Sequence, residues 1–269
     1  MKSIFVFVFV FVCGLVHAQA QIFDLKKLNN DDFKSFLESK KIIFVGEMHG
    51  TTEVPQFVGE LISSWRSTGK RITFGIEMPK EYQGDVDEYQ RTGDFEKLMK
   101  IPHFKVPDGR GSVAMGELIK KIRKMEDVKI VCFDEANVSG NKRDSLMAVN
   151  LLSHVTNGSM VVLTGNIHAH PKEGFWKPWF KSAAFQLKRM TNAGEKMVSI
   201  NAYFGGGTIW NCMNDGCKER EAFAARDFGK ASEAKEFVNF SLQADPSGYD
   251  GYVYFAQVSA SKPSIPDDK

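Results

Sequence analysis

The sequence lacks the short signatures that would identify its chemistry at once. It contains neither HExxH, the zinc-protease motif, nor GxSxG, the serine-hydrolase motif. Its 35 basic and 33 acidic side chains nearly balance at a net charge of +2, so the composition gives no indication of nucleic acid as a partner. Any functional site must therefore be inferred from single residues and their places in the predicted fold.

The one long apolar run lies at the N-terminus and is short for a membrane span. Lys2 precedes the run IFVFVFVFVCGLV, and the small residues Ala18 and Ala20 follow it. This is the pattern of a secretory signal with an A-x-A cleavage site. We expect residues 1–20 to be removed, the protein to be periplasmic or secreted, and no stable membrane span to remain. An uncleaved anchor is the alternative.

Cysteines are few, and three of the four follow the predicted signal. Cys212 and Cys217 enclose Met-Asn-Asp-Gly, a turn-forming sequence, and export permits oxidation. We expect a disulfide there that closes a small hairpin-like loop, because two thiolates without a nearby His are a poor metal site. Cys132 lies in the apolar run KIVCF and is predicted to be a small core residue.

About 250 residues remain after the signal, enough for one α/β domain, which we place at residues 21–260. The remaining residues 261–269 (SKPSIPDDK) are predicted to be a disordered tail. Residues 81–110 are irregular and are expected to hold one helix at most. They are either an insertion that covers one edge of the sheet or an excursion without function.

Short apolar runs alternate with segments of helical spacing along the chain. The runs predict strands at 42–45, 71–76, 129–133, 159–164, 197–204 and 252–258, and the helical spacing predicts helices at 54–66, 112–124 and 142–155. Such alternation is typical of an α/β fold with a largely parallel central sheet flanked by helices.

Acidic residues or histidines follow each of the first four predicted strands. They are, in chain order, Glu47 and His49, then Glu77, then Asp134 and Glu135, then Asn166, His168 and His170. Each alone has a structural explanation, such as a capping Glu or a hydrogen-bonded loop His. Crossovers of one hand place the ends of parallel strands on the same edge, where ligands bind. The repetition therefore predicts a shared polar cleft at that edge.

These residue types permit two mechanisms. His49 is a candidate general base that activates water against an ester, amide or peptide bond, with Arg143 holding a substrate carboxylate or developing negative charge. Alternatively, Glu47, His49, Glu77 and His168 bind a divalent metal ion, and a metal-bound water is the nucleophile. The spacing does not decide between the two.

Two residues of the irregular segment need a separate reading. His103 lies in a loop flanked by prolines and is predicted to be at the surface. Arg110, in the sequence DGRGS, is either part of a turn and helix cap or a side chain that the covering loop supplies to the cleft.

Taken together, the motifs resemble a known superfamily. GEMHG, the Glu of GIEMP, the pair Arg143-Asp144 at a helix start and GNIHA resemble the erythromycin esterases, the ChaN-like haem-binding lipoproteins and the TIKI/TraB proteases. The resemblance covers roughly Ile42–His168, and the later YDGYVYF resembles the closing strand of that superfamily. It implies an α/β sheet flanked by helices.

The branches of the superfamily imply different chemistry. The esterase branch implies a hydrolytic centre of Glu47, His49, Glu77 and His168, with His49 as the base. The expected supporting groups are Arg143, Asp144, Asp134, Asn166 and Arg110. The TIKI-like branch implies a divalent metal at the same four positions, and the ChaN-like branch implies haem or iron.

The chain departs from two branches in visible ways. The lipid-anchor cysteine of the ChaN-like proteins is missing, and the helical insertion of the esterases is longer than any segment here. Our prediction from the sequence is an exported hydrolase acting on a small molecule or peptide. A haem- or metal-binding protein without turnover is the alternative, and a non-catalytic interaction domain is a third.

Overall fold

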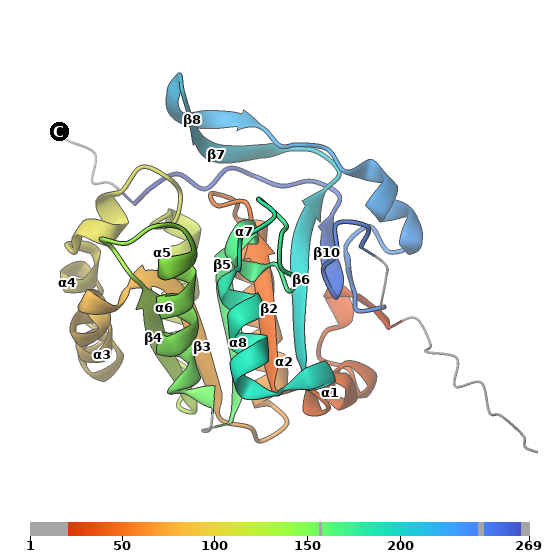
Figure 1. Cartoon of the computed structure of the whole chain (residues 1–269), viewed down its shortest axis with the longest axis horizontal. Helices are drawn as coiled ribbons and strands as arrows, with labels where there is room; N and C mark the ends of the chain where they lie inside the picture. The colour runs from red at the N-terminus through yellow and green to blue at the C-terminus, as the bar shows by residue number, and fades with distance from the viewer. Residues whose placement is uncertain (1–20, 156–157, 242–244, 265–269) are drawn as a thin grey trace, which may run out of the picture.

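The centre of the fold is a mostly parallel sheet, in the strand order β1-β9-β10-β6-β2-β5-β3-β4 (Figure 1). The computed structural model describes residues 21–155, 158–241 and 245–264. Strands β10, β6, β2, β5, β3 and β4 run parallel, and β9 runs antiparallel between β1 and β10. The predicted α/β class with a largely parallel sheet is confirmed. The strands are β1 Ile22–Asp24, β2 Ile42–Glu47, β3 Ile72–Pro79, β4 Val128–Asp134, β5 Ser159–Gly165, β6 Met197–Phe204, β9 Phe237–Asn239 and β10 Gly251–Phe255.

Continuous apolar runs form these strands because the sheet is covered on both faces. In β2, Ile43 and Val45 point into one core, and Ile42 and Phe44 point into the other. Helices α1, α2 and α5 cover the first face, and α6 and α8 cover the second, which faces the viewer in Figure 1. The helices are α1 Asp31–Glu38, α2 Glu53–Arg66, α3 Gln83–Thr92, α4 Phe95–Met99, α5 Val113–Arg123, α6 Gly140–Leu152, α7 Asn166–Ala169 and α8 Ala183–Thr191.

The helix starts follow local chemistry. The side chains of Asn30, Ser112 and Ser182 each accept a hydrogen bond from a backbone N–H in the first turn of α1, α5 and α8. A cap of this kind is typically worth about 1 kcal/mol. The caps fix where α5 and α8 begin, and both starts lie near the carboxyl edge of the sheet.

The irregular segment contains more structure than the sequence predicted. Instead of one helix at most, residues 81–110 contain α3, α4 and a 3-10 turn at Pro102–Lys105. Gly93, with φ 82°, ends α3, and the side chain of the next residue, Asp94, caps the start of α4. Helix α4 has only five residues, and α3 buries only Val86 and Tyr89, so neither produces a clear 3.6-residue apolar period in the sequence.

A separate hairpin carries the predicted disulfide. Strands β7 Thr208–Met213 and β8 Gly216–Glu221 pair antiparallel, and Cys212 and Cys217 face each other and are bonded. Cys132 is buried and free, as expected. The predicted signal, residues 1–20, lies outside the described residues, and within those residues no helix has the length and apolarity of a membrane span.

The predicted disordered tail is wrong for its first four residues. Ser261 is buried, the Lys262 carbonyl accepts a hydrogen bond from Val113 N, and Ser264 N donates to the Gly111 carbonyl. The start of α5 has backbone groups that need partners, and this segment supplies them. Residues 265–269 lie outside the described residues.

Candidate active site at the carboxyl edge of the sheet

Four neighbouring strands bring the candidate residues together. Strands β2, β5, β3 and β4 are adjacent in that order, and their carboxyl ends lie on one edge. Glu47 ends β2, Glu77 lies near the end of β3, and Asp134 ends β4. His168 lies in α7, which directly follows β5. Burial of the strands forces these polar side chains to cluster where the strands stop.

His49 is held by one carboxylate and faces another. Its Nδ1 lies 3.0 Å from Oε1 of Glu47, and its Nε2 lies 3.8 Å from Oε2 of Glu77. Burial lowers the pKa of His49, but the hydrogen bond to Glu47 and the charges of Glu77 and Glu47 outweigh burial and raise the pKa above its ordinary value. Oε2 of Glu47 is buried and has no protein partner among the described residues.

Glu77 is fixed by donors on every side. Its Oε2 accepts from Thr164 Oγ1 at 2.5 Å and from Gly165 N at 2.7 Å, and its Oε1 accepts from Arg143 Nη2 at 2.9 Å. Burial would raise the pKa of this carboxyl. The charges of His168, His49 and Arg143 and the Thr164 hydrogen bond hold it well below its usual range. Glu77 is therefore a carboxylate at all ordinary pH values.

Arg143, in the first turns of α6, joins three of the four strand ends. Its Nε and Nη2 donate to the two carboxylate oxygens of Asp134, each at 2.7 Å. Its Nη2 also contacts Glu77, and its Nη1 lies 3.1 Å from Nε2 of His168. A bidentate guanidinium pair of this kind has a defined geometry as well as a favourable charge interaction.

His168 is oriented from both of its ring nitrogens. Nδ1 lies 2.8 Å from Oδ1 of Asp144, which is fully buried and also accepts from Ala183 N at 2.8 Å. Because Arg143 can only donate, the Nε2 of His168 must accept, and Nδ1 carries the proton toward Asp144. Burial lowers the pKa of His168, but the hydrogen bond to Asp144 and the charges of Glu77 and Asp144 outweigh burial and raise the pKa above its ordinary value. In its neutral form, above that pKa, His168 positions Arg143 through Nε2.

Arg110 reaches the same site from the covering segment. Its Nε and Nη2 pair with Oδ2 of Asp108 at 2.8 and 2.6 Å. Its Nη1 lies 3.5 Å from Asp134 and 3.8 Å from Glu77, beyond good hydrogen-bond distance. Nη1 of Arg110 therefore faces the carboxylates of Asp134 and Glu77 without forming a good hydrogen bond to either.

Close backbone packing holds the Arg110 loop against the His49 loop. Gly50 and Gly109 both have φ 88°, and a Cβ on Gly109 would lie 3.0 Å from Cα of Gly50. A Cβ on Gly50 would collide with the carbonyl oxygen of Trp210 in the hairpin. Trp210 Nε1 donates to the Pro107 carbonyl at 2.8 Å. The glycines of GEMHG and DGRG are needed because three backbones meet there.

Three other residues named from the sequence lie apart from this centre. The Asn166 side chain accepts from Ile167 N, its own neighbour. Glu135 pairs with Lys80 at 2.6 Å. His170 stacks on Phe175 and bonds to the backbone carbonyl of Ser247. None of the three contacts Glu77 or His49 through a hydrogen bond in the described structure.

His103 is not at the surface, as the sequence predicted, but 4% exposed in the 3-10 turn. Burial, followed by the charge of Arg110, lowers its pKa to about 4, so it is neutral at ordinary pH. Its Nε2 is buried without a protein partner among the described residues. The prolines on either side suggested an exposed loop, but the segment folds inward over the cleft.

Two cavities border the centre and share Arg110. One, of about 570 Å³, is lined by Arg110, Arg143 and His168. Its lining also includes Tyr82, Trp176 and Phe180, which the sequence did not indicate. The second, of about 10 Å³, is lined by Glu47, His49, Ile76, Glu77, Arg110, Met115 and Leu163. A volume near 10–15 Å³ accommodates about one water molecule.

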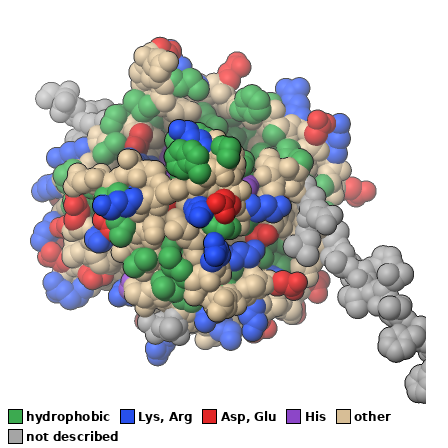
Figure 2. All heavy atoms as spheres, in the orientation of Figure 1, with side chains coloured by type: hydrophobic (Ala, Val, Ile, Leu, Met, Phe, Trp, Pro, Cys, Tyr) green, Lys and Arg blue, Asp and Glu red, His purple; other side chains and the backbone are tan. Residues whose placement is uncertain are grey.

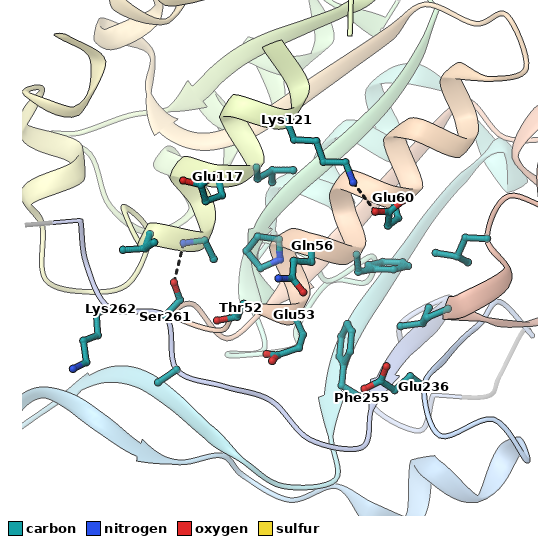
Figure 3. Close-up of a pocket in the computed structure, with 18 residues that line it drawn as sticks. Thr52, Glu53, Gln56, Glu60, Glu117, Lys121, Glu236, Phe255, Ser261 and Lys262 are labelled. Carbon is teal, nitrogen blue, oxygen red and sulfur yellow. Dashed lines mark hydrogen bonds and ion pairs between the residues drawn. The ribbon is translucent and has the colours of Figure 1, made fainter. Parts of the chain in front are cut away.

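Another cavity of about 790 Å³ lies between α2, α5 and the C-terminal segment (Figure 3). Its lining contains no histidine, and two of its charged groups, Lys121 and Glu60, pair across it at 2.6 Å. Although larger, it lacks the convergent ionisable groups of the carboxyl edge. We therefore place the candidate active site at that edge.

The donor set fits a metal ion poorly. In the part of the chain that the structure describes, no three His, Cys, Asp or Glu side chains are arranged to hold one. The cationic Arg143 already occupies the space between Glu77, Asp134 and His168. Haem fits no better, because His168 has both ring nitrogens engaged and Nε2 of His49 faces a cavity of about 10 Å³.

Comparisons with known proteins establish the fold. The structure is similar to erythromycin esterase EreC, at a TM-score of 0.67 and 10% identity over 93% of this chain and 100% of that chain. This is the erythromycin esterase fold. The same fold is seen in a succinoglycan biosynthesis protein, at a TM-score of 0.65 and 11% identity over 87% of this chain and 93% of that one.

The remaining comparisons do not indicate a function for this chain. Haem-binding ChaN of Campylobacter jejuni matches at a TM-score of 0.46 and 14% identity over 69% of this chain and 91% of that one, too distant to indicate haem here. No protein-family model matches the sequence, and neither does any curated protein. Function must therefore be argued from the site itself.

Proposed function

We propose that the protein is an exported hydrolase that cleaves an ester, amide or peptide bond with a water molecule activated by His49. The observation that carries the proposal is the Glu47–His49 pair. With Nδ1 bonded to a buried carboxylate at 3.0 Å, the imidazole has one orientation and presents Nε2 to the cleft. A histidine held in this way is a typical general base.

The small cavity supplies a place for the nucleophile. It lies among His49, Glu77 and Arg110 and has the volume of about one water molecule. The unpartnered Oε2 of Glu47 offers a water there an acceptor. In the proposed first step, Nε2 of His49 takes a proton from this water while its oxygen forms a bond to the substrate carbonyl carbon.

The two arginines would stabilise the negative charge that this attack creates. Nη1 of Arg110 makes only contacts of 3.5 Å and longer with the carboxylates, so it retains capacity for an oxyanion. Arg143 is held by Asp134 and His168 and adds a fixed positive charge beside it. Preorganised charge of this kind commonly contributes several kcal/mol to the barrier reduction.

The second step returns the proton. The tetrahedral intermediate collapses, the bond to the leaving oxygen or nitrogen breaks, and protonated His49 donates its proton to that atom. Products are a carboxylic acid and an alcohol or amine, so atoms and charge balance. Glu77 stays ionised throughout and stabilises the protonated His49, whose Nε2 lies 3.8 Å away. The cavity of about 570 Å³, whose lining includes Tyr82, Trp176 and Phe180, would hold the remainder of the substrate.

The decisive experiment is a hydrolysis screen over carboxylic esters, amides and peptides. We expect His49→Ala to lower kcat by about 10²–10⁴-fold against any substrate found. His154→Ala, a histidine after α6 and outside the site, is the matched control and should retain full activity. Activity that persists in His49→Ala would reject the proposal.

A haem- or metal-binding protein is the alternative that the sequence suggested, so the same preparations should be titrated with haem and analysed for metals. We expect no Soret band that depends on His49 or His168, and activity that survives a chelator. A stoichiometric haem complex lost in His49→Ala would replace the hydrolase with a carrier.

A further inference from the structure

The segment between α7 and α8 exposes three aromatic side chains within five residues. Phe175, Trp176 and Trp179 are 39%, 54% and 55% exposed. We call residues 174–180 the aromatic loop. The other large exposed apolar side chains are dispersed over separate elements, at Val113, Val149, Met190, Met213 and Phe223. Gathered exposed aromatics mark an interaction surface far more often than isolated ones do.

The aromatic loop is held rigidly at its base. Gly174 N donates to the Phe180 carbonyl at 2.9 Å, and the buried Phe180 ring anchors the loop. The Asn141 side chain, at the start of α6, bonds the Trp179 carbonyl at 2.9 Å and Lys181 N at 2.8 Å. The loop backbone is fixed while its tryptophan rings remain about half exposed, so ordering the loop on binding would cost little entropy.

The charge around the aromatic loop is positive. Nζ of Lys177 lies over both tryptophan rings, at 4.7 Å from Trp176 and 5.4 Å from Trp179. Lys172 and Lys181 flank the loop, and one acid, Glu173, offsets them. The face of the molecule shown in Figure 2 has hydrophobic side chains interspersed with Lys and Arg and with Asp and Glu. Tryptophan mixed with lysine is the composition favoured at the boundary between water and lipid.

The aromatic loop extends beyond the cavity of about 570 Å³ that borders the candidate active site. Trp176 and Phe180 line that cavity beside Arg143 and His168, whereas Phe175 and Trp179 do not. A soluble substrate inside the cavity would cover Trp176 and leave Trp179 in water. An extended partner covers both rings.

We propose that the aromatic loop binds an anionic lipid surface. Trp176 and Trp179 insert among the headgroups, and Lys172 and Lys177 contact the lipid phosphates. Phe175 stays packed on His170 at the base. The opening of the cavity of about 570 Å³ then lies against the bilayer. This binding does not depend on the proposed hydrolase activity and is tested without a substrate.

The test is co-sedimentation with vesicles of phosphatidylglycerol and phosphatidylcholine in equal parts, compared with phosphatidylcholine alone. We expect wild type to bind the anionic vesicles, and the double variant Trp176→Ser/Trp179→Ser to bind at least about tenfold more weakly. Lys177→Gln should weaken anionic binding by about fivefold and leave neutral vesicles unaffected. All variants share one N-terminus, so the apolar run at residues 4–16 cannot cause a difference between them.

Phe223→Ser is the matched control, because Phe223 is 80% exposed but lies outside the aromatic loop; its binding should equal that of wild type. Intrinsic fluorescence gives a second readout. The sequence has four tryptophans and Trp65 is fully buried, so a blue shift that wild type shows on adding vesicles and the double variant lacks would report Trp176 and Trp179. The variants should keep wild-type circular dichroism, because the substituted rings are outside the core.

Wild type that fails to sediment with anionic vesicles, or a double variant that sediments equally well, would overturn the proposal. If wild type does not bind vesicles and the double variant loses hydrolysis of a water-soluble substrate, the proposal is also overturned. The aromatic loop would then be part of a site for a soluble substrate.

Discussion

Nη1 of Arg143 lies 3.1 Å from Nε2 of His168, and this contact makes the two site histidines inequivalent. An arginine can only donate, so the nitrogen of His168 that faces the site has no free lone pair. Nε2 of His49 has no such donor and faces Glu77 at 3.8 Å. One histidine is thus suited to accept a proton and the other to hold a cation in place.

This asymmetry predicts different losses. His49→Ala should abolish most turnover, whereas His168→Asn should lower kcat by up to about a hundredfold through misplacement of Arg143. Steady-state kinetics on one substrate would measure both. Equal losses with the same pH profile in the two variants would contradict the separate roles.

The pH dependence of kcat/KM should report His49. A base must be neutral to act, and the pKa of His49 lies above its ordinary value of 6.5, so activity should fall as the pH drops through that raised pKa. Glu47→Gln removes the negative charge that raises the pKa of His49 and leaves a weaker, uncharged acceptor for its Nδ1. The acid limb of the residual activity should therefore move to lower pH. If the acid limb of Glu47→Gln lies at the same pH as that of wild type, the titration of His49 is not its cause.

Glu77→Gln should destabilise the protein by about 3 kcal/mol near pH 7, because Arg143 and Gly165 lose a buried carboxylate. The folded pKa of Glu77 is lowered, so its contribution is present above the unfolded value of 4.5 and is lost as the pH falls toward the folded value. Urea unfolding should show a smaller difference in the free energy of unfolding between wild type and Glu77→Gln near pH 4 than near pH 7. Glu117→Gln, at an exposed pair, should change stability by less than about 1 kcal/mol at either pH.

Gly165 leaves room for the site. A Cβ there would lie 3.1 Å from Nε2 of His49 and 3.6 Å from Oε2 of Glu77, although its backbone suits any residue. Gly165→Ala should lower kcat by about tenfold or more through displacement of His49. Gly84→Ala, where a Cβ meets nothing within 4 Å, should keep activity and gain about 0.4–1 kcal/mol of stability. Full activity in Gly165→Ala would mean that His49 tolerates displacement.

Trp210 should act on catalysis through Arg110. Trp210→Phe removes the 2.8 Å hydrogen bond to Pro107 and loosens the loop that carries Arg110. We expect kcat/KM to fall several-fold with a stability loss of about 0.5–1.5 kcal/mol. In combination with Arg110→Lys, the two losses should be less than additive. Strict additivity would show that Trp210 and Arg110 act independently.

The sequence predicted the sheet well because its signals are local. Runs such as 42–47 and 159–165 are buried on both faces, and one-handed crossovers oblige their ends to meet. Glu47, Glu77 and Asp134 were therefore recognisable without coordinates. The pairing of Cys212 with Cys217 followed from a turn sequence between them.

What was missed depends on contacts between distant segments. Nothing near His103 indicates that residues 102–110 fold inward, because the partners of that segment are the hairpin and Gly50. Trp176 and Tyr82 became visible as cavity residues only once the loops were placed. The order of residues 261–264 likewise depends on the start of α5, which lies far away in the chain.

The carbonyl of Gly50, next to His49, accepts hydrogen bonds from Trp210 N and Ser261 N. Ribosomes synthesise a chain from its N-terminus, so the loop that carries His49 emerges long before the segments that hold it in place. The site is completed only when residues near 261 have emerged as well. A nascent chain that ends before these segments leaves the Gly50 carbonyl without either partner, so the loop beside His49 takes its final position only when nearly the whole chain is present.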